Sequence, residues 1–324
     1  MHDEQRFLDQ NESDYSLHLS VGRTGLLNGQ LGESGLPITS TVCEDRVLLD
    51  AWHPIAAMED IAPERAHATQ LLGGQLHYGI GGSDDVVWAE VADRGACPTM
   101  VRYGYLWVSL GNPPDELFVI PECDEPDRRS VHGGTIGVAV SAPRAVENFL
   151  DMGHFPFIHN GLLGQAPHTE VVGYSVEIDR STNDIYARNC VFYQPVAAVM
   201  ATDGQLSRYT YRVPHPHCVL LYKTCPGDSR RFDVIALFLQ ATTSETIRAH
   251  NFLSLIDDSS TEAQIRRFQQ HIFGQDKPIL ENQRPKRLPL DTRAETPIRA
   301  DKSSILYRRW LSELGVTYTT IPAS

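Results

Sequence analysis

Short runs of alternating hydrophobic and polar residues fill the second half of the chain, a pattern typical of β-strands. They cover residues 171–178, 185–193, 208–213, 218–223, 232–240 and 247–256, and Asp, Asn and Gly residues stand between them. Because most of these separations are as short as hairpin loops, the pattern predicts one antiparallel sheet. An earlier run at 135–140 predicts another strand, and 143–149 predicts a short helix after it.

After the predicted sheet, apolar residues follow at helical spacing. A helix is predicted to begin at Ser259, because Glu262 three residues later can complete a capping box. We expect Gly274 and Pro278 to break or kink this helix. A last helix is predicted over 301–314, and it ends where Gly315 can adopt a left-handed conformation.

The first half of the chain is less regular. Residues 1–45 are rich in Gly, Ser, Asp and Asn without a sustained period, which predicts a mobile extension. Residues 112–129 contain four prolines among acidic residues and cannot continue a helix or a central strand. Between these segments, β-like runs cover 47–52, 69–72, 75–78, 86–91 and 100–110.

The chain is therefore predicted to be an α+β protein in three parts. We expect a flexible N-terminal extension over 1–45, a small β domain over 46–125 and a larger domain over 126–324 that combines the antiparallel sheet with the helices.

Composition narrows the possible functions. The formal net charge of -13, without a block of Lys and Arg, argues against nucleic acid as a partner. No apolar run approaches the roughly 20 residues of a membrane helix, and the polar N-terminus lacks a secretory signal, so we expect a cytoplasmic protein that does not contact a membrane. The six cysteines are dispersed, and we interpret them as free thiols.

Candidate chemistry lies in the segment 147–159, which contains His154 and His159 and, three residues before the first histidine, Asp151. With 13 histidines in the chain, this spacing alone does not specify a metal. The surrounding residues are apolar, however, and buried imidazoles need partners, which a metal ion supplies. Asp151 fits a carboxylate that fixes the tautomer of a metal-bound histidine, although it could also be a solvated helix-end residue. Two histidines and one carboxylate would form a facial triad on Fe(II), but spacing cannot select the carboxylate.

The segment 147–159 resembles the iron-binding motif of Rieske non-haem iron oxygenase α subunits. The segment 273–283 resembles the part of those proteins that supplies the carboxylate ligand, which maps onto Asp276, and weaker similarities occur at 52–56, 103–108 and 300–311. The resemblance covers roughly residues 48–315. It implies a mononuclear Fe(2+) held by His154, His159 and Asp276, with Asp151 as a catalytic residue through which electrons enter. It also implies a Rieske-like β domain followed by a helix-grip (START/Bet v 1-like) catalytic domain.

One departure from the family changes the expected function. A 2Fe-2S Rieske cluster needs Cys-x-His and Cys-x2-His, and none of the six cysteines is followed by histidine at either position. The segment between Gly79 and Val101 is also too short to hold both cluster-binding loops. We therefore expect no 2Fe-2S ligands in this chain and a degenerate β domain.

The chain is similar to cluster-less members of the family that demethylate methylxanthines. This resemblance implies the catalytic subunit of a multicomponent monooxygenase that uses O2 to hydroxylate an N-methyl group of a methylxanthine-like heterocycle and releases formaldehyde. The methyl group on N7 is the expected target. It implies electrons from NAD(P)H through a reductase that carries the Rieske centre, and a homotrimer or hetero-oligomer.

Four residues at helical offsets from Asp276 are candidates for the substrate pocket if the helix continues: Gln269, Phe273, Leu280 and Gln283. The alternative is that they are ordinary core and surface residues. Three other functions stay open: a non-catalytic scaffold subunit, an aromatic O-demethylase or hydroxylase, and a zinc hydrolase that uses the same triad. A second metal site at His215, His217 and Cys218 is also conceivable, since alternate residues share a strand face.

Overall fold

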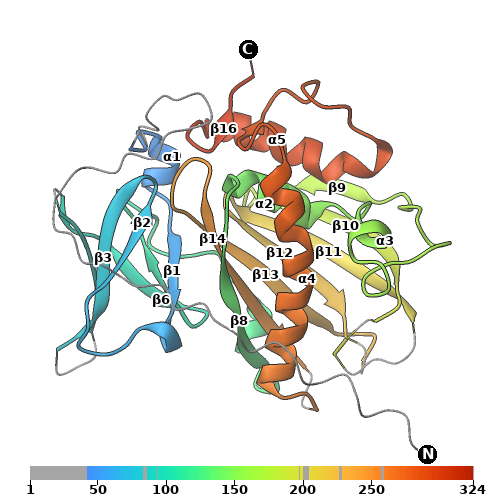
Figure 1. Ribbon diagram of the computed structural model, residues 1–324, viewed down its shortest axis with the longest axis horizontal. Coiled ribbons are helices and arrows are strands. Elements are labelled where there is room, and N and C mark those ends of the chain that lie inside the picture. The colour runs from blue at the N-terminus through green and yellow to red at the C-terminus, as the bar shows by residue number, and fades with distance from the viewer. Residues whose placement is uncertain are drawn as a thin grey trace, which may run out of the picture. The chain divides into compact units, whose positions relative to one another are not determined.

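A seven-stranded antiparallel sheet organises the computed structural model, which describes residues 42–82, 86–92, 94–196, 198–199, 204–225, 228–256 and 259–323 (Figure 1). The strand order is β8-β14-β13-β12-β11-β10-β9. The strands are β8 (Arg129–Val138), β9 (Ser175–Ile178), β10 (Ile185–Gln194), β11 (Gln205–His215), β12 (Cys218–Thr224), β13 (Phe232–Ala241) and β14 (Ile247–Leu255). Neighbouring strands pair antiparallel throughout, so the predicted antiparallel sheet is confirmed.

The two faces of this sheet pack against different partners. On β12, Val219 and Leu221 belong to the largest buried cluster, which also contains Phe273 from the long helix. Cys218 and Leu220 alternate with them and join a second cluster with Trp107 and other aromatic residues of the first half of the chain. The period-two pattern of the sequence therefore corresponds to a strand that is buried on both faces.

Helix α4 (Glu262–Asn282) lies across one face of the sheet (Figure 1). Its capping box is formed by Thr261 and Gln264, not by Ser259 and Glu262 as predicted. The predicted break is also wrong, since α4 continues past Pro278 to Asn282. The proline removes only one intrahelical hydrogen bond, and the packing of the apolar face of α4 stabilises the helix around it.

The other helices are α2 (Ala142–Leu150), the short α3 (Phe155–Ile158) and α5 (Lys302–Leu314). Both α2 and α5 agree with the predicted helices, and Gly315 ends α5 in a left-handed conformation with φ of 81°. Single turns of 3₁₀ helix, η1 (Met58–Asp60), η2 (Pro121–Asp124) and η3 (Arg299–Asp301), lie in the connections. Strands β15 (Leu288–Pro289) and β16 (Thr320–Ile321) pair in parallel.

The first half of the described chain contains two smaller sheets. The first has the strand order β1-β7-β6 and consists of β1 (His53–Ala57), β7 (Tyr105–Val108) and β6 (Thr99–Arg102). The second has the strand order β2-β3-β4-β5 and consists of β2 (His67–Leu71), β3 (Gly74–Gly81), β4 (Val86–Val91) and β5 (Gly95–Ala96). Most β-like runs of the prediction are thus confirmed as strands.

Two predictions in this half are wrong. The run at 47–52 contains the helical turn α1 (Arg46–Leu49), because the Asp45 side chain accepts hydrogen bonds from the backbone N–H groups of Val47 and Leu48. The run at 100–110 contains parts of two strands, and the chain reverses at Tyr103 and Gly104, both with positive φ.

Residues 40–324 form one compact unit, and the N-terminal extension expected over 1–45 lies almost entirely outside the described residues. The boundary expected near residue 125 stays a prediction. Among the described residues, no helix has both the length and the apolar character required to cross a bilayer.

Candidate metal centre and substrate cavity

Three side chains from two separate segments converge on one point. Nε2 of His154 lies 3.2 Å from Nε2 of His159, and these atoms lie 3.4 and 3.1 Å from Oδ1 of Asp276. His154 precedes α3 and His159 follows it, so this single helical turn sets the separation of the two rings. Asp276 comes from α4, and all three side chains are largely buried.

The triangle has the donor set and dimensions of a metal site. Oδ1 of Asp276 is buried and has no hydrogen-bond partner among the described residues, although two ring nitrogens lie close to it. Ligand atoms at these separations can all lie about 2.1 Å from one ion placed on one side of their plane. Two imidazoles and a carboxylate in a facial arrangement leave the opposite side open, as in non-haem Fe(II) oxygenases.

Each histidine has its own supporting residue. Nδ1 of His154 lies 3.0 Å from Oδ2 of Asp151, and Nδ1 of His159 lies 2.8 Å from Oε1 of Gln275. Both partners accept the ring N–H and thereby leave Nε2 free for a metal. The sequence indicated Asp151 but not Gln275, because one glutamine on a helix carries no recognisable pattern.

The charges of the metal-free site favour cation binding. Burial lowers the pKa of His154, but the nearby carboxylates of Asp151 and Asp276 outweigh burial and raise the pKa to about 9. Burial raises the pKa of Asp276, but the nearby imidazoles of His154 and His159 outweigh burial and lower the pKa to about 2. A cation that displaces the His154 proton therefore enters a site whose carboxylate is already ionised.

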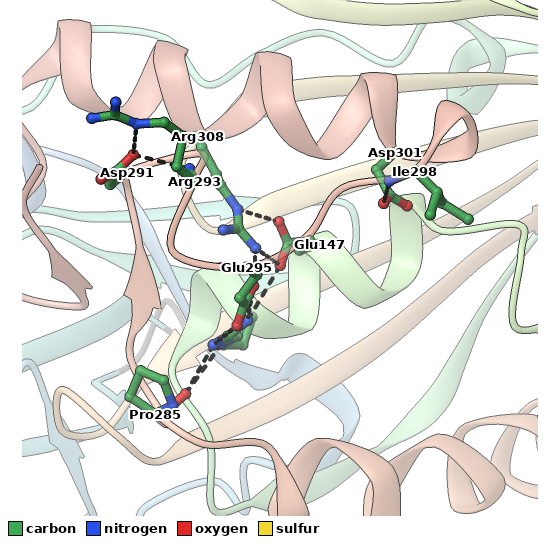
Figure 2. A network of polar contacts seen from close by, with 9 residues as sticks. Glu147, Pro285, Asp291, Arg293, Glu295, Ile298, Asp301 and Arg308 are labelled. Carbon is green, nitrogen blue, oxygen red and sulfur yellow. Dashed lines mark hydrogen bonds and ion pairs between the residues drawn. The ribbon is translucent and has the colours of Figure 1, made fainter.

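A network of ion pairs holds the helix that leads into the site (Figure 2). Glu147 on α2 accepts hydrogen bonds of 2.6 and 2.8 Å from Arg308 on α5. Arg308 and Arg144 both also bond Glu295, in the connection between α4 and α5. The network therefore ties α2 to α5, and with it the position of Asp151 directly after α2.

A cavity of about 680 Å³ extends from the three ligands between α4 and the sheet. Most of its wall is apolar, with Phe149, Phe155 and Leu163 among the residues nearest the ligands in sequence. A few polar side chains, among them that of Gln194, also line the cavity. A largely apolar cavity with a few polar groups is typical of a site for a small organic molecule.

Only two of the four predicted pocket residues line this cavity. Gln269 and Phe273 lie on its wall, on the same face of α4 as Asp276. Leu280 is instead part of the buried core, and Gln283, the C-cap of α4, borders a separate depression of about 290 Å³. The cavity ends near Asp276, so residues further along the helix are beyond its reach. The role of all four in substrate binding stays a prediction.

Asp151 borders that same separate depression. Its side chain is 32% exposed, whereas that of His159 is 1% exposed, so Asp151 lies between the buried ligands and the surface.

The second metal site considered at His215, His217 and Cys218 is not among the possible metal-binding groups of the described residues. His215 and His217 pack against His53, with ring centroids 5.8 Å from it in both cases. In the described part of the chain, Glu59, Asp60 and His132 form another group with suitable geometry, and the two acidic residues of this group are exposed.

Comparison with known proteins identifies the family. Residues 138–317 match the family described as vanillate O-demethylase oxygenase C-terminal domain. The chain is 45% identical over 278 residues to the "Probable methylxanthine N7-demethylase NdmC" of Pseudomonas sp. (strain TJI-51), a match that covers 86% of this chain and 98% of that protein. It is 29% identical over 226 residues to methylxanthine N1-demethylase NdmA of Pseudomonas putida, covering 68% of this chain and 61% of NdmA.

The solved structure of Pseudomonas putida CBB5 NdmA with caffeine is similar in fold. The match has a TM-score of 0.66 and 21% sequence identity, and it covers 83% of this chain and 91% of that chain. At this identity, it supports the α+β fold with antiparallel sheets and nothing finer. The chain belongs to the Rieske non-haem iron oxygenases, and its residues 138–317 form a domain of the vanillate O-demethylase oxygenase type.

Proposed function

We propose that this chain is the catalytic subunit of a methylxanthine N-demethylase that removes the methyl group from N7 and releases it as formaldehyde. The observation that carries this proposal is the ligand triangle of His154, His159 and Asp276 at the end of a largely apolar cavity. The substrate class rests on the similarity to NdmC over nearly the whole of that protein.

The chain's own residues have distinct parts in this reaction. His154, His159 and Asp276 would hold Fe(II), which supplies O2 activation when bound. Asp151 and Gln275 orient the two imidazoles. Phe149, Phe155 and the other apolar residues of the cavity exclude bulk water from the reacting methyl group, while Gln269 and Phe273 contact the heterocycle from α4.

We further propose that electrons come from a separate protein that carries a 2Fe-2S centre and is reduced by NAD(P)H. The cysteine pattern supports this, because no cysteine is followed by histidine two or three residues later. The three-stranded and four-stranded sheets would then be a degenerate Rieske domain, and the sheet with α4 a helix-grip domain. Asp151, near the surface, is the proposed entry point for electrons, and the working form would be a homotrimer or hetero-oligomer in the cytoplasm.

A single-turnover experiment tests the proposal. The protein is loaded with Fe(II) anaerobically, mixed with a chemically reduced Rieske reductase and 7-methylxanthine, and exposed to O2. We expect formaldehyde and xanthine in equal amounts, up to one per bound iron. Asp276→Ala should give none, whereas Asp179→Ala, which removes a carboxylate that bonds Ser181 within its own turn, should behave as the wild type.

Other outcomes point to other functions. Bound iron without product from any methylxanthine, but with formaldehyde from a methoxylated benzoate, would favour aromatic O-demethylation, the activity in the family's description. A protein that binds no iron would favour a scaffold subunit. Hydrolysis supported by Zn(II) would favour the hydrolase alternative.

A further inference from the structure

Gln194 lies in the cavity wall close to the metal ligands. It is the last residue of β10 and is only 2% exposed. Phe192, two residues earlier and on the same strand face, packs edge-on against Phe155 with ring centroids 5.4 Å apart. Phe155 in turn packs against the ring of His154 at 5.1 Å. Gln194 therefore lies about 7 Å along the strand from a residue that packs beside the ligands, within reach of a bound heterocycle.

The amide of Gln194 is held in one orientation. Ser207, on the neighbouring strand β11, donates a hydrogen bond of 3.2 Å from its hydroxyl to Oε1 of Gln194. Ser207 is itself fully buried. The Nε2 group has no hydrogen-bond partner among the described residues. Gln194 lines the cavity, so this N–H group is available as a donor to a ligand bound there.

Gln269 presents the opposite group from the other wall. Its Nε2 donates a hydrogen bond of 3.4 Å to Oδ1 of Asn251, whose own Nδ2 donates to the backbone oxygen of Gly134. The contact with Asn251 orients the amide and leaves Oε1 as an acceptor without a partner among the described residues. Gln269 precedes Asp276 by two helical turns, so both side chains face the cavity.

We propose that Gln194 is a second specificity-determining residue, whose Nε2 donates a hydrogen bond to a ring carbonyl of the substrate while Oε1 of Gln269 accepts one from a ring N–H. This inference rests on the proposed function for the substrate class. The pyrimidinedione ring of a xanthine alternates C=O and N–H along its edge, which matches one fixed donor and one fixed acceptor. A donor and an acceptor on opposite walls also define the orientation of a flat ring, and so which methyl group faces the ligands.

The same arrangement selects against substrates that carry more methyl groups. Methylation of the ring nitrogen removes its hydrogen and leaves Oε1 of Gln269 without a donor. A site built around a hydrogen bond discriminates strongly against a ligand that lacks the bonding group. The enzyme should therefore prefer a xanthine methylated at N7 alone over caffeine.

Binding, rather than turnover, tests the role of Gln194. Calorimetric titration of Co(II)-loaded protein with 7-methylxanthine measures affinity without electrons or O2. We expect Gln194→Leu to weaken binding roughly tenfold. Gln194→Glu, which keeps the shape and the acceptor for Ser207 but removes the donor, should weaken it at least as much. Gln205→Leu is the matched control, since Gln205 pairs with Gln194 in register but is not on the cavity wall.

Two further measurements separate hydrogen bonding from folding. Wild-type protein should bind 7-methylxanthine more tightly than 7-methylpurine, which has no carbonyl groups, and Gln194→Leu should reduce this preference about tenfold. Ser207→Ala should weaken binding by a few-fold in the wild type but not in Gln194→Leu, because Ser207 acts through Gln194.

Wild-type affinity in both Gln194 variants, or an unchanged preference over 7-methylpurine, would overturn the role of Gln194 and leave the proposed function intact. If the wild type binds no methylxanthine at all, the proposed function fails, and this assignment fails with it.

Discussion

At the scale of single residues, the two histidines of the site are supported unequally. His154 hydrogen-bonds the carboxylate of Asp151, whereas His159 hydrogen-bonds the neutral amide of Gln275. A carboxylate partner increases the electron density on a ligand, and an amide mainly fixes ring orientation. The charged partner, Asp151, has a side chain that is 32% exposed, so the difference in charge coincides with the side from which electrons are proposed to arrive.

Gln275→Leu should reduce metal affinity 10–100-fold, because His159 loses the acceptor that fixes its tautomer and orientation. Titration with Co(II) against a competing chelator measures this directly, and the visible spectrum of bound Co(II) reports any change in geometry. Gln270→Leu, five residues earlier on the exposed side of α4, should leave both unchanged. Equal affinities for the Gln275 and Gln270 variants would show that Gln275 does not support the ligand.

Metal affinity should depend on pH through His154. Only neutral imidazole binds a metal, and the pKa of His154 in the metal-free protein is raised to about 9. Below that pH a proton must leave before metal can bind, so affinity should fall by up to tenfold per pH unit from 9 to 7. Calorimetric Co(II) titrations at pH 7, 8 and 9 would measure the slope.

Asp151→Asn provides the comparison for this pH dependence. The substitution removes the negative charge of one of the two carboxylates that raise the pKa of His154, so the proton should leave at lower pH. The slope between pH 7 and 9 should then become shallower. A wild-type affinity that is flat over this range would contradict a protonated His154.

The sequence reveals some of these residues and conceals others for a physical reason. His154, His159 and Asp151 lie within one short segment, where local spacing already suggests a common ligand. Asp276 approaches them only through the packing of α4 on the sheet, and spacing could not select it among 41 acidic residues; the family resemblance did. Gln194 and Gln275 can be recognised only in the structure, which shows which of their amide atoms form hydrogen bonds.

At the scale of elements, the site depends on the fixed position of α2. Glu147 and Arg308 form a bidentate ion pair whose side chains are 13% and 8% exposed. Arg308→Met should destabilise the protein by about 3–5 kcal/mol, because it leaves a buried carboxylate without its main partner. Urea unfolding monitored by circular dichroism would measure the change.

Two comparisons make this prediction specific. Arg188→Met breaks an ion pair with Glu177 in which both side chains are exposed, and it should cost no more than about 1 kcal/mol. Combining Glu147→Leu with Arg308→Met removes both charges and should recover much of the lost stability. If the double variant is no more stable than Arg308→Met alone, the cost does not come from an unpaired carboxylate.

The elements themselves were predictable where pattern and packing agree. Strands β10 to β14 alternate in the sequence because both faces of the sheet are buried against different clusters. Predictions failed where local chemistry overrides the pattern. The apolar run at 47–52 contains a helical turn because Asp45 caps it, and α4 continues through Pro278 because tertiary packing outweighs one missing hydrogen bond.

At the scale of the whole molecule, the ligand triangle and the cavity are the proposed catalytic centre, and its electron supply is proposed to lie elsewhere. Demethylation of one substrate molecule consumes one O2, two electrons and two protons, and it yields formaldehyde, water and the demethylated base. Ferrous iron alone cannot supply both electrons by a one-electron oxidation, and the cysteine pattern provides no cluster in this chain for the second.

The Fe(II)-loaded chain, mixed with 7-methylxanthine and O2 alone, should therefore release less than a tenth of an equivalent of formaldehyde. Addition of a reduced Rieske protein should raise the yield toward one per iron. Asp151→Asn should retain bound iron but slow the electron transfer that precedes product, which rapid mixing would detect as slower oxidation of the partner. A full equivalent of formaldehyde from the chain alone would mean that it has its own source of the second electron, and the assignment of a separate electron carrier would have to be abandoned.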